Sequence, residues 1–505
     1  MPDTVLVQEL ASRLVGVAII SSDIADSDLD GHVVEELVSL VNSYCESLEK
    51  PVLLDRAVIS QVIGKAHPRP AAQKVEVVGA LDFRPVAKEI EGRFSTRSVD
   101  TGKTAGTVAD FTGYFNDRLA RIKSAIYEGQ SGKMAGMTHS IESIKQYTAG
   151  REIIIAGMVY DKFITKNGHV LVTVEDDTGI AKVLFIKPQH MEGRMADLFT
   201  SATRIVNDEV IAVKGKISGP FVMASALVYP DVPVHQRRQT SDDIAIAFMS
   251  DVHVGSKLFM QKQFDKFLDW INGKVDYRRD LAGKIKYIVV SGDLVDGIGV
   301  YPNQDKELSI ADIYLQYKEL FRMLVEIPEY IHVFLLTGNH DGVQRAEPQP
   351  QLPEEFYRDF KPSNIHLVSN PGYVTAEGIK VLGYHGTSLD SVIQGIPGCS
   401  YSKPEGAMLE VLKRRHLSPI YGDNPIVPAK SDPMVIDQVP DVLHMGHLHK
   451  NGYSEYHGTM IVNSGTWQAR TSYQVRLGHM PTPAILPVYE GKQMTMSAVD
   501  FNTAF

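Results

Sequence analysis

Ile244-Ala-Ile-Ala-Phe-Met249 is an apolar run that leads directly into Ser250-Asp251-Val252-His253. Runs of four to six apolar residues that end in polar or glycine-containing turns are typical of buried strands. Asp251 and His253 are two residues apart on an extended segment, so both side chains can face the same side and chelate one ion. This stretch therefore predicts a buried strand with metal-binding side chains at its carboxyl end.

The same pattern recurs four more times toward the C-terminus. Tyr287-Ile-Val-Val290 leads to Asp293, Val333-Phe-Leu-Leu336 leads to Asn339-His340-Asp341, Val381-Leu-Gly-Tyr384 leads to His385, and Asp441-Val-Leu-His-Met445 leads to His447 and His449. Strands that all carry polar groups at their carboxyl ends would gather these groups at one edge of a sheet, where α/β folds keep their sites. We therefore expect an α/β domain with one polar edge.

The candidate ligands at this edge are nitrogen and oxygen donors, namely Asp251, His253, Asp293, Asn339, His385, His447 and His449. Such a set without cysteine suits two hard-to-borderline divalent ions better than one structural zinc. Asp293 is the natural bridging carboxylate, since one oxygen can serve each ion. Two ions about 3.5–4 Å apart would clamp a phosphodiester and lower the pKa of a water between them. The expected chemistry is two-metal phosphoester hydrolysis.

His340 is the candidate catalytic acid. It directly follows Asn339, so its side chain should point away from the ions and toward the substrate. An ordinary histidine pKa of about 6.5 suits protonation of a leaving alkoxide. Asp341 either orients that ring or caps its turn, and Asp296 either supports a ligand or stabilises a turn. The histidines outside the pattern are interpreted as structural or surface residues: His332, His366, His416, His444 and His457.

The composition indicates a multidomain soluble protein. The chain has 505 residues, which is too long for one core, and a net charge of −10, which excludes a basic nucleic-acid coat. Its two cysteines, Cys45 and Cys399, have no paired spacing, so we expect no disulfide framework. The N-terminus does not resemble a signal peptide, and no apolar run approaches the roughly 18 residues of a membrane span. We expect a cytoplasmic protein without membrane contact.

Residues 1–65 are predicted to form a small helical interaction module, because apolar residues repeat at helical spacing over 33–44. Residues 66–140 are predicted to be a linker with one amphipathic helix, whose apolar face carries Phe115, Leu119, Ile122 and Ile126. Its basic residues Arg118, Arg121 and Lys123 are interpreted as a solvated surface in preference to a DNA contact.

In residues 141–238 the hydrophobic period changes to two. Five expected strands at 153–159, 170–174, 182–185, 210–216 and 221–228, with an insertion between the third and fourth, fit an OB-type barrel. Such barrels bind single strands through a basic groove and stacking aromatics. Only Tyr160 and Phe163 are exposed aromatic candidates here, so we favour a protein–protein or supporting role for this barrel.

Longer strings resemble a known family. The five short motifs are similar to those of the calcineurin-like metallophosphoesterase superfamily. Three strings look like the small subunits of archaeal DNA polymerase D: Gly338-Asn-His-Asp-Gly-Val-Gln-Arg-Ala-Glu-Pro-Gln-Pro350, Tyr384-His-Gly-Thr-Ser-Leu-Asp390 and Val462-Asn-Ser-Gly-Thr-Trp-Gln468. The resemblance is closest over residues 140–480.

This resemblance implies a two-layered β-sandwich flanked by helices over 239–505, preceded by the OB barrel and the helical module. It implies a proofreading 3′→5′ exonuclease that uses two divalent ions, Mn²⁺ or Mg²⁺ ahead of Zn²⁺ or Fe²⁺. The implied partners are the large catalytic subunit of DNA polymerase D and DNA with a single-stranded or mismatched 3′ end. By the family pattern, Asp251, His253, Asp293 and His449 would hold one ion, Asp293, Asn339, His385 and His447 the other, and His340 would be the general acid.

Several assignments remain open at this level. Arg345 and Arg470 are the candidate phosphate contacts, and Lys403, Lys413, Arg414 and Arg415 could also reach a DNA backbone. Trp467 is either a wedge against a terminal base or a core residue. The tail at 477–505 is expected to be one strand and a frayed end, and a sliding-clamp-binding peptide at 493–501 would have poorly fitting spacing. The alternatives for the whole chain are a non-catalytic scaffold subunit and a free-standing metallophosphatase or phosphodiesterase.

Overall fold

The structure is a computed structural model that describes residues 18–20, 52–54, 83–129, 134–359 and 361–503. The chain divides into two compact units, Met1–Glu76 and Val77–Phe505. In the first unit the described residues form the short strands β1 (Ala18–Ile20) and β2 (Val52–Leu54), which pair in parallel. The helices expected within 1–65 lie outside the described residues.

The second unit contains a closed five-stranded barrel, as the alternating pattern predicts. Its strands are β4 (Glu152–Ile164), β5 (Val170–Asp176), β6 (Gly179–Phe185), β7 (Val210–Ser218) and β8 (Phe221–Val228). They close in the order β4-β5-β6-β8-β7 around a core that includes Ile155, Val172, Val183 and Val213. Helix α6 (Arg194–Thr203) is the expected insertion between the third and fourth strands, and η4 (Ala135–Met137) and α5 (Ile141–Ile144) precede the barrel.

Two six-stranded sheets form the rest of the unit. The first has the order β12 (Ile365–Leu367), β11 (His332–Leu336), β10 (Ile285–Ser291), β9 (Ala245–Met249), β18 (Ile485–Glu490) and β19 (Thr495–Asp500). The second has the order β16 (Asn451–Tyr456), β17 (Thr459–Ser464), β15 (Val442–Met445), β14 (Ile379–Gly383), β13 (Gly372–Ala376) and β3 (Phe94–Ser98). Strands β9, β10 and β11 are mutually parallel, and so are β14, β15 and β17.

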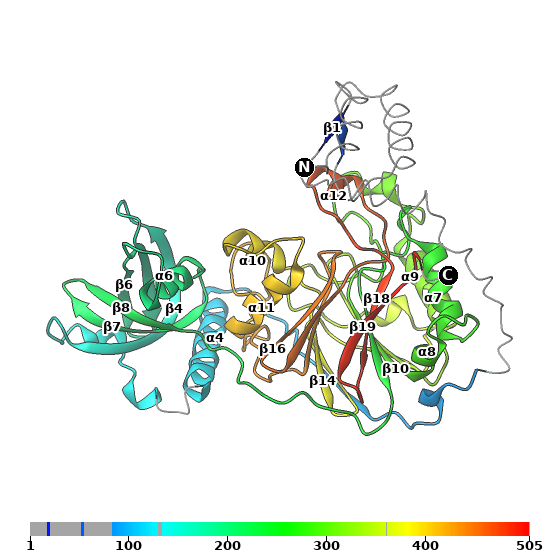
Figure 1. The fold of residues 1–505 in the computed structure, drawn as a ribbon, viewed down its shortest axis with the longest axis horizontal. Coiled ribbons are helices and arrows are strands. Elements are labelled where there is room, and N and C mark those ends of the chain that lie inside the picture. The colour runs from blue at the N-terminus through cyan, green and yellow to red at the C-terminus, as the bar shows by residue number, and fades with distance from the viewer. Residues whose placement is uncertain (1–17, 21–51, 55–82, 130–133, 360, 504–505) are drawn as a thin grey trace, which may run out of the picture. The chain divides into compact units, whose positions relative to one another are not determined.

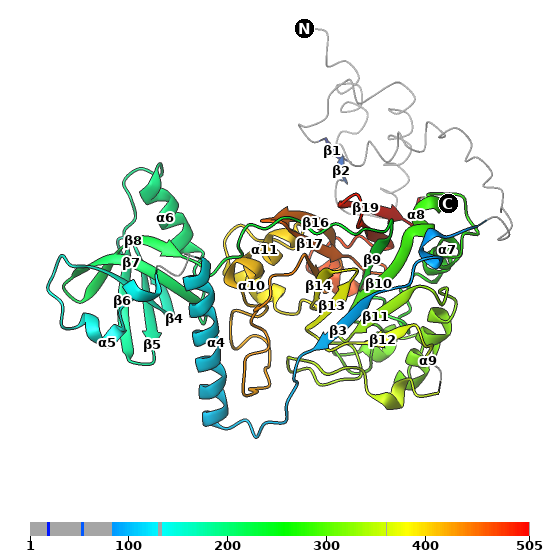
Figure 2. The same cartoon turned by 90° about the horizontal axis from the view of Figure 1, so that it is seen from below.

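The sheets stack because successive side chains of their strands point to opposite faces. In β10, Tyr287 and Val289 pack between the sheets with Val381 of β14, whereas Ile288 and Val290 face the other way. That outer face is covered by α7 (Gln261–Ile271), α8 (Arg279–Lys284) and α9 (Ile313–Leu324), and the outer face of the second sheet by α10 (Leu389–Gly395) and α11 (Pro404–Arg414) (Figures 1 and 2). The remaining elements are η3 (Val86–Lys88), η5 (Gln304–Glu307), η6 (Glu354–Phe356) and α12 (Ser472–Arg476).

The strand ends therefore come from two stacked sheets and not from one edge of a single sheet. The carboxyl ends of β9, β10 and β11 belong to the first sheet, and those of β14 and β15 to the second. This corrects the expectation of one sheet edge, and it places the candidate ligands around the end of the sandwich where both layers terminate. Among the described residues, no helix is both long and apolar enough to cross a bilayer.

Strand β3 lies inside the stretch that was expected to be a linker. It pairs antiparallel with β13 and covers the edge of the second sheet. Phe94 of β3 packs against Tyr287, Phe334 and His366. Pairing satisfies the backbone groups of β13, which would otherwise form an open sheet edge. The chain from 83 to 98 is thus part of the sandwich.

The tail also differs from the expectation, because it forms two strands, β18 and β19, that complete the first sheet. Phe501 follows β19 and is fully buried against Phe267 and Trp467. Trp467 is 1% exposed, so it is a core residue and not a wedge. The buried Phe501 gives no support to a clamp-binding peptide at 493–501.

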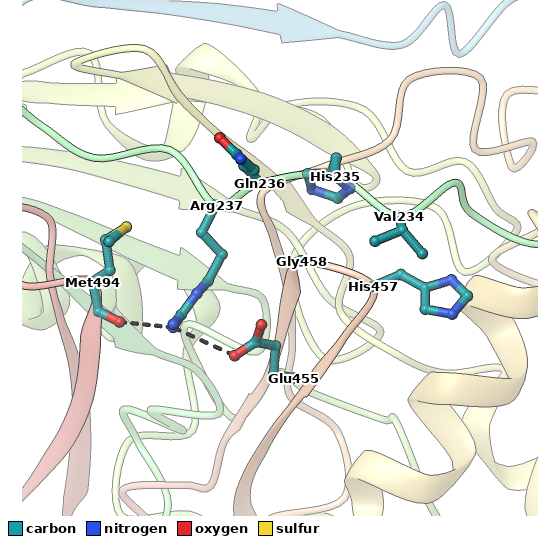
Figure 3. A pocket seen from close by; sticks show the side chains of 8 residues that line it. All are labelled: Val234, His235, Gln236, Arg237, Glu455, His457, Gly458 and Met494. Atoms are coloured by element: carbon teal, nitrogen blue, oxygen red, sulfur yellow. Dashed lines mark hydrogen bonds and ion pairs between the residues drawn. The ribbon is translucent and has the colours of Figure 1, made fainter.

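The connector between barrel and sandwich, residues 232–240, donates backbone hydrogen bonds to the turn between β16 and β17 and to the turn between β18 and β19. Figure 3 shows Arg237 between the carbonyl of Met494, to which it donates at 2.8 Å, and the carboxylate of Glu455 in β16, at 3.4 Å. A Cβ at Gly458 would lie 2.1 Å from the carbonyl oxygen of His235, so only glycine allows this close approach. The small pocket here is lined by none of the candidate ligands and serves to hold the connector.

Helix α4 (Val108–Gly129) joins the barrel to the sandwich. Its predicted apolar residues Leu119, Ile122 and Ile126 pack on the barrel strands β4 and β7 and on Val435. Arg118 is 2% exposed and pairs with Asp432 at 2.6 Å, so its interpretation as a solvated residue was wrong. A buried guanidinium needs a carboxylate partner, and Asp432 provides it.

We expect His416, which shares Asp432 with Arg118, to make the protein acid-sensitive. Its Nε2 donates to Asp432 at 2.8 Å and its Nδ1 accepts from the amide of Ser418 at 3.0 Å, so only the neutral ring is satisfied. Burial, with help from Arg118, lowers the pKa of His416 to about 4. Because the folded pKa is depressed, this contribution to stability is present above about pH 6.5 and is lost as the pH falls toward 4, by up to about 1.4 kcal/mol per pH unit.

The measurement is the free energy of unfolding in urea at pH 7, 6 and 5 with chelator present. The variant His416→Gln removes the titrating group, so its stability should fall less steeply with acid than that of the unmodified protein. Parallel pH curves for the two proteins would contradict the assignment.

Candidate metal centre

Two buried carboxylates occupy the middle of the site. Asp251 follows β9 and is 0% exposed, and Asp293 follows β10 and is 1% exposed. Asp251 accepts a hydrogen bond from the backbone amide of His447 at 2.9 Å, and Asp293 accepts one from that of His340 at 2.9 Å. Each carboxylate at the end of one strand is therefore held by the loop that follows another strand.

Imidazole nitrogens surround these carboxylates. His253 and His449 bring their Nε2 atoms to 3.1 Å from each other, and Nε2 of His449 lies 3.3 Å from Asp251. Nε2 of His385 lies 3.3 Å from Asp293 and 3.0 Å from Oδ1 of Asn339. Ligand atoms of Asp251, His253 and His449 all lie within 4.8 Å of one another, as do those of Asp251, Asp293 and His385. This donor set fits divalent ions that prefer nitrogen and oxygen ligands.

His447 departs from the expected arrangement. Its ring lies 5.2 Å from that of His385, but its Nε2 is hydrogen-bonded to Asp390 at 3.0 Å. The structure thus brings six of the seven predicted ligands into direct contact with one another. His447 lies beside them with its Nε2 on a carboxylate that was not predicted to take part.

The carboxylates and imidazoles of the centre shift one another's pKa. Burial opposes charge on Asp293, yet His385, His340 and His253 together hold its pKa well below the usual value. Burial likewise opposes charge on His385, but Asp293 and Asp251 outweigh it and raise the pKa of His385 to about 10. Buried carboxylates without a metal must thus be compensated by protonated imidazoles, and a divalent cation would replace those protons.

The backbone at the ligands is strained. Asp251, His253, Asp293, His447 and His449 all have positive φ, between 50° and 66°. A non-glycine residue in this region costs roughly 1–2 kcal/mol, and such residues persist where the surrounding structure demands them. Five of the seven predicted ligands share this feature, and they lie in the loops after β9, β10 and β15.

A second layer of side chains orients the ligands. Nδ1 of His253 contacts Asp296 at 3.0 Å, which directs its Nε2 at the carboxylates. Gln468 donates to the same carboxylate of Asp296 at 3.0 Å. Nδ1 of His385 donates to the carbonyl of Ser291 at 2.9 Å. Of the two interpretations of Asp296, the support of a ligand is therefore the one that the geometry favours.

Two supporting residues were not found from the sequence. Asp390 contacts His447, and Gln474 contacts Nδ1 of His449 at 2.9 Å. Asp390 ends one of the family-like strings, and that string was the only signal for it. Gln474 forms a capping box with Thr471, so its spacing predicts the start of α12 but not the contact with His449.

His340 faces the cleft, as expected for an acid. Nδ1 donates to the backbone carbonyl of Asp296 at 2.7 Å, so Nε2 is the nitrogen that titrates, and it lies 3.9 Å from Asp293. Asp341 does not contact this ring. It accepts from the amides of Gly338 and Leu294 and from the hydroxyl of Tyr317, which settles its role as a turn cap.

The basic residues considered as phosphate contacts differ in exposure. Arg345 and Arg470 are exposed, and Arg345 donates to the carbonyl of Val300, which lines the cleft. Arg414 and Arg415 are 2% and 7% exposed and are bonded to protein groups, so they do not face DNA. Lys413 lies over the ring of Tyr456, 5.2 Å from its centroid, and Lys403 is exposed at the start of α11.

The metal-binding groups open into a cleft of about 950 Å³. His253, Asp293, Asn339, His340, His447 and His449 line one end of it. The other residues come mainly from the loop after β10, from α10 and the loop that follows it, and from the segment around α12. A cleft of about 950 Å³ is within the size range of small-molecule binding sites.

The chain is similar to a group of replication proteins. The family model for the B subunits of DNA polymerases alpha and epsilon matches residues 246–452. The DNA polymerase II small subunit of Archaeoglobus fulgidus is 37% identical over 469 residues, which cover 89% of this chain and 89% of the relative. The same subunit of Methanothermobacter thermautotrophicus is 39% identical over 80% of this chain and 82% of its own length, and that of Methanocaldococcus jannaschii is 40% identical over 76% and 64%.

Proposed function

Because this chain belongs to the family of archaeal DNA polymerase II small subunits, we propose that it edits DNA for a polymerase as a two-metal 3′→5′ exonuclease. The single observation that carries the proposal is the gathering of Asp251, His253, Asp293, Asn339, His385 and His449 around the end of the sandwich. A subunit with only a scaffold role has no need for two buried carboxylates ringed by histidines.

We assign the sandwich to the metallophosphoesterase fold and the barrel to the OB fold. The two stacked sheets flanked by helices, with ligands at their strand ends, support the first assignment. The strand order β4-β5-β6-β8-β7, with a helix between the third and fourth strands, supports the second.

By the family pattern, Asp251, His253, Asp293 and His449 would hold one divalent ion, and Asp293, Asn339, His385 and His447 the other. Ligand atoms of Asp251, His253 and His449 lie within 4.8 Å of one another, as do those of Asp251, Asp293 and His385. Mn²⁺ or Mg²⁺ suits these ligands, and the ions would supply Lewis-acid chemistry at the phosphodiester. Asp296 and Gln474 keep the rings of His253 and His449 oriented. Since Nε2 of His447 is bonded to Asp390, this residue would take part through its Nδ1 or after its Nε2 leaves that carboxylate.

His340 would protonate the leaving oxygen of the DNA chain. The carbonyl of Asp296 fixes the proton on Nδ1, which leaves Nε2 to hold the proton that is transferred. Arg345 and Arg470, which are exposed, would contact phosphates outside the cleft. The large polymerase subunit is the proposed partner, and DNA with an unpaired 3′ end is the proposed substrate.

We expect the purified chain, alone or with its large subunit, to shorten 3′-mismatched oligonucleotides when Mn²⁺ is added and to stop when a chelator is added. The assay follows a 5′-labelled oligonucleotide on a gel, and metal content is measured by mass spectrometry of the dialysed protein. A small phosphomonoester serves as the control substrate and should not be hydrolysed at a comparable rate. A complex of this chain with the large polymerase chain that assembles normally, holds no divalent ions and degrades no DNA would establish the scaffold role instead.

A further inference from the structure

Three aromatic side chains line the cleft together with the candidate ligands. The ring of Tyr401 stacks on that of His479, with centroids 4.2 Å apart and an interplanar angle of 29°. Tyr473, on α12, lines the same cleft and is 57% exposed. We call these three side chains the aromatic wall. An exposed aromatic ring such as that of Tyr473 buries a large area when it contacts a flat ligand, and the half-buried pair of Tyr401 and His479 extends this aromatic surface.

The charge of the cleft is opposite to that expected for a phosphate-binding groove. Its lining includes the carboxylates of Asp293, Asp296, Glu307 and Asp390, and among its described lining residues there is no lysine or arginine. Within the described part of the chain, the cleft lining offers no lysine or arginine for the phosphates, so apart from divalent ions at the candidate metal centre, binding in the cleft would depend on contacts with the bases. Base stacking on aromatic side chains does not depend on phosphate charge.

The aromatic wall is connected to the metal centre by hydrogen bonds. Nε2 of His447 lies 3.0 Å from Asp390, and the hydroxyl of Tyr401 also hydrogen-bonds to Asp390. On the other side, Tyr473 is the neighbour of Gln474, which contacts His449. A ligand on the wall would therefore lie within reach of the catalytic end of the same cleft.

We propose that Tyr401, Tyr473 and His479 form a stacking subsite for the unpaired 3′-terminal nucleoside of a single-stranded nucleic acid. The subsite rests on the proposed function, because that function places the terminal phosphodiester at the metal end of the cleft. A base enters it only after leaving its duplex, and a mismatched base leaves at lower cost than a paired one. The wall thus supplies both affinity and a preference for frayed ends.

The test compares Tyr473→Leu with Tyr473→Phe in the full chain. Tyr473→Leu should raise the KM for a short single-stranded oligonucleotide about tenfold without a comparable fall in kcat, since stacking of one base contributes an effect of this order. Tyr473→Phe keeps the ring and should restore most of the affinity. Val475→Ala, also exposed on α12 but outside the cleft lining, is the matched control.

The diagnostic substrate has an abasic 3′ end. If the wall stacks the terminal base, the unmodified protein should bind this oligonucleotide about tenfold more weakly than its normal counterpart. The substitution Tyr473→Leu should then cause no further loss of affinity for the abasic oligonucleotide. If Tyr473→Leu lost the same affinity for normal and for abasic 3′ ends, the proposal would be overturned and Tyr473 would have only a structural role.

Binding is also followed by fluorescence anisotropy with Ca²⁺ in place of Mn²⁺, so that affinity is measured without turnover. If the unmodified protein cleaves nothing but discriminates between normal and abasic ends, the exonuclease fails while the subsite stands. If it cleaves both ends with the same KM, the exonuclease stands and the subsite is rejected.

Discussion

The variant His340→Ala is expected to lower kcat for exonucleolytic cleavage by about 10²–10⁴-fold, the usual contribution of a positioned general acid. The carbonyl of Asp296 holds Nδ1 of His340, so no other nitrogen of this ring can deliver a proton into the cleft. The four residues assigned to the first ion and the four assigned to the second do not include His340. Both ions should therefore stay bound in the variant.

His340→Asn is the sharper form of this test, because an amide nitrogen can still donate to the carbonyl of Asp296 while no group replaces Nε2. It should be as inactive as His340→Ala and retain the same metal content. His190→Ala removes an exposed histidine of the barrel region and should change neither kcat nor the metal content. Loss of one ion from both His340 variants would reassign this residue as a ligand, a role that its grouping with His253 and Asp293 also permits.

The variant Arg414→Met is expected to destabilise the protein by about 3–5 kcal/mol at neutral pH, the cost of leaving a buried carboxylate without its partner. Arg414 is 2% exposed and forms ion pairs with Glu209, near the start of β7, and with Glu410 of α11. It also donates to the carbonyl of Arg204 at the end of α6. It therefore joins the barrel to the sandwich.

The loss of unfolding free energy in Arg414→Met should increase with pH. Burial raises the pKa of Glu209, and Arg414 opposes that rise. Without the guanidinium, Glu209 can become neutral by binding a proton, which is easier in acid. The cost of Arg414→Met, measured by urea denaturation, should thus grow from pH 5 to pH 8.

The neighbouring Lys413→Met is the control for Arg414→Met, because Lys413 is half-buried and has no carboxylate ion pair among the described contacts. It should cost less than about 1 kcal/mol at every pH. A small, pH-independent effect of Arg414→Met would mean that the junction does not depend on this ion pair.

The strand-end motifs could be predicted because their apolar runs and following polar residues are local in sequence. Six predicted ligands meet as expected, since parallel strands bring their carboxyl ends together. The division of the strands between two sheets could not be predicted, because pairing partners are set by packing between distant segments. Strand β3 was not predicted for the same reason, because its pairing depends on a distant strand. Its sequence, Phe94-Ser-Thr-Arg-Ser98, has only one large apolar side chain and resembles a linker.

Charged residues were the main source of error. Arg118 and Arg414 lie on helices, where an arginine is ordinarily exposed, and only the partners Asp432 and Glu209, which are distant in sequence, reveal that they are buried. The contacts of Asp390 with His447 and of Gln474 with His449 were missed for the same reason. A side chain that acts through another leaves no periodic pattern.

The left-handed backbone at Asp251, His253, Asp293, His447 and His449 has a consequence for how such a site is lost. Replacing one of these residues with glycine would relax the main chain, and removing a buried carboxylate would end its need for compensation. If the proposed reaction were no longer needed, the stability of the fold would not require these residues. On the proposed function, selection for the reaction is what keeps them, and a descendant released from that selection would become a more stable sandwich without activity.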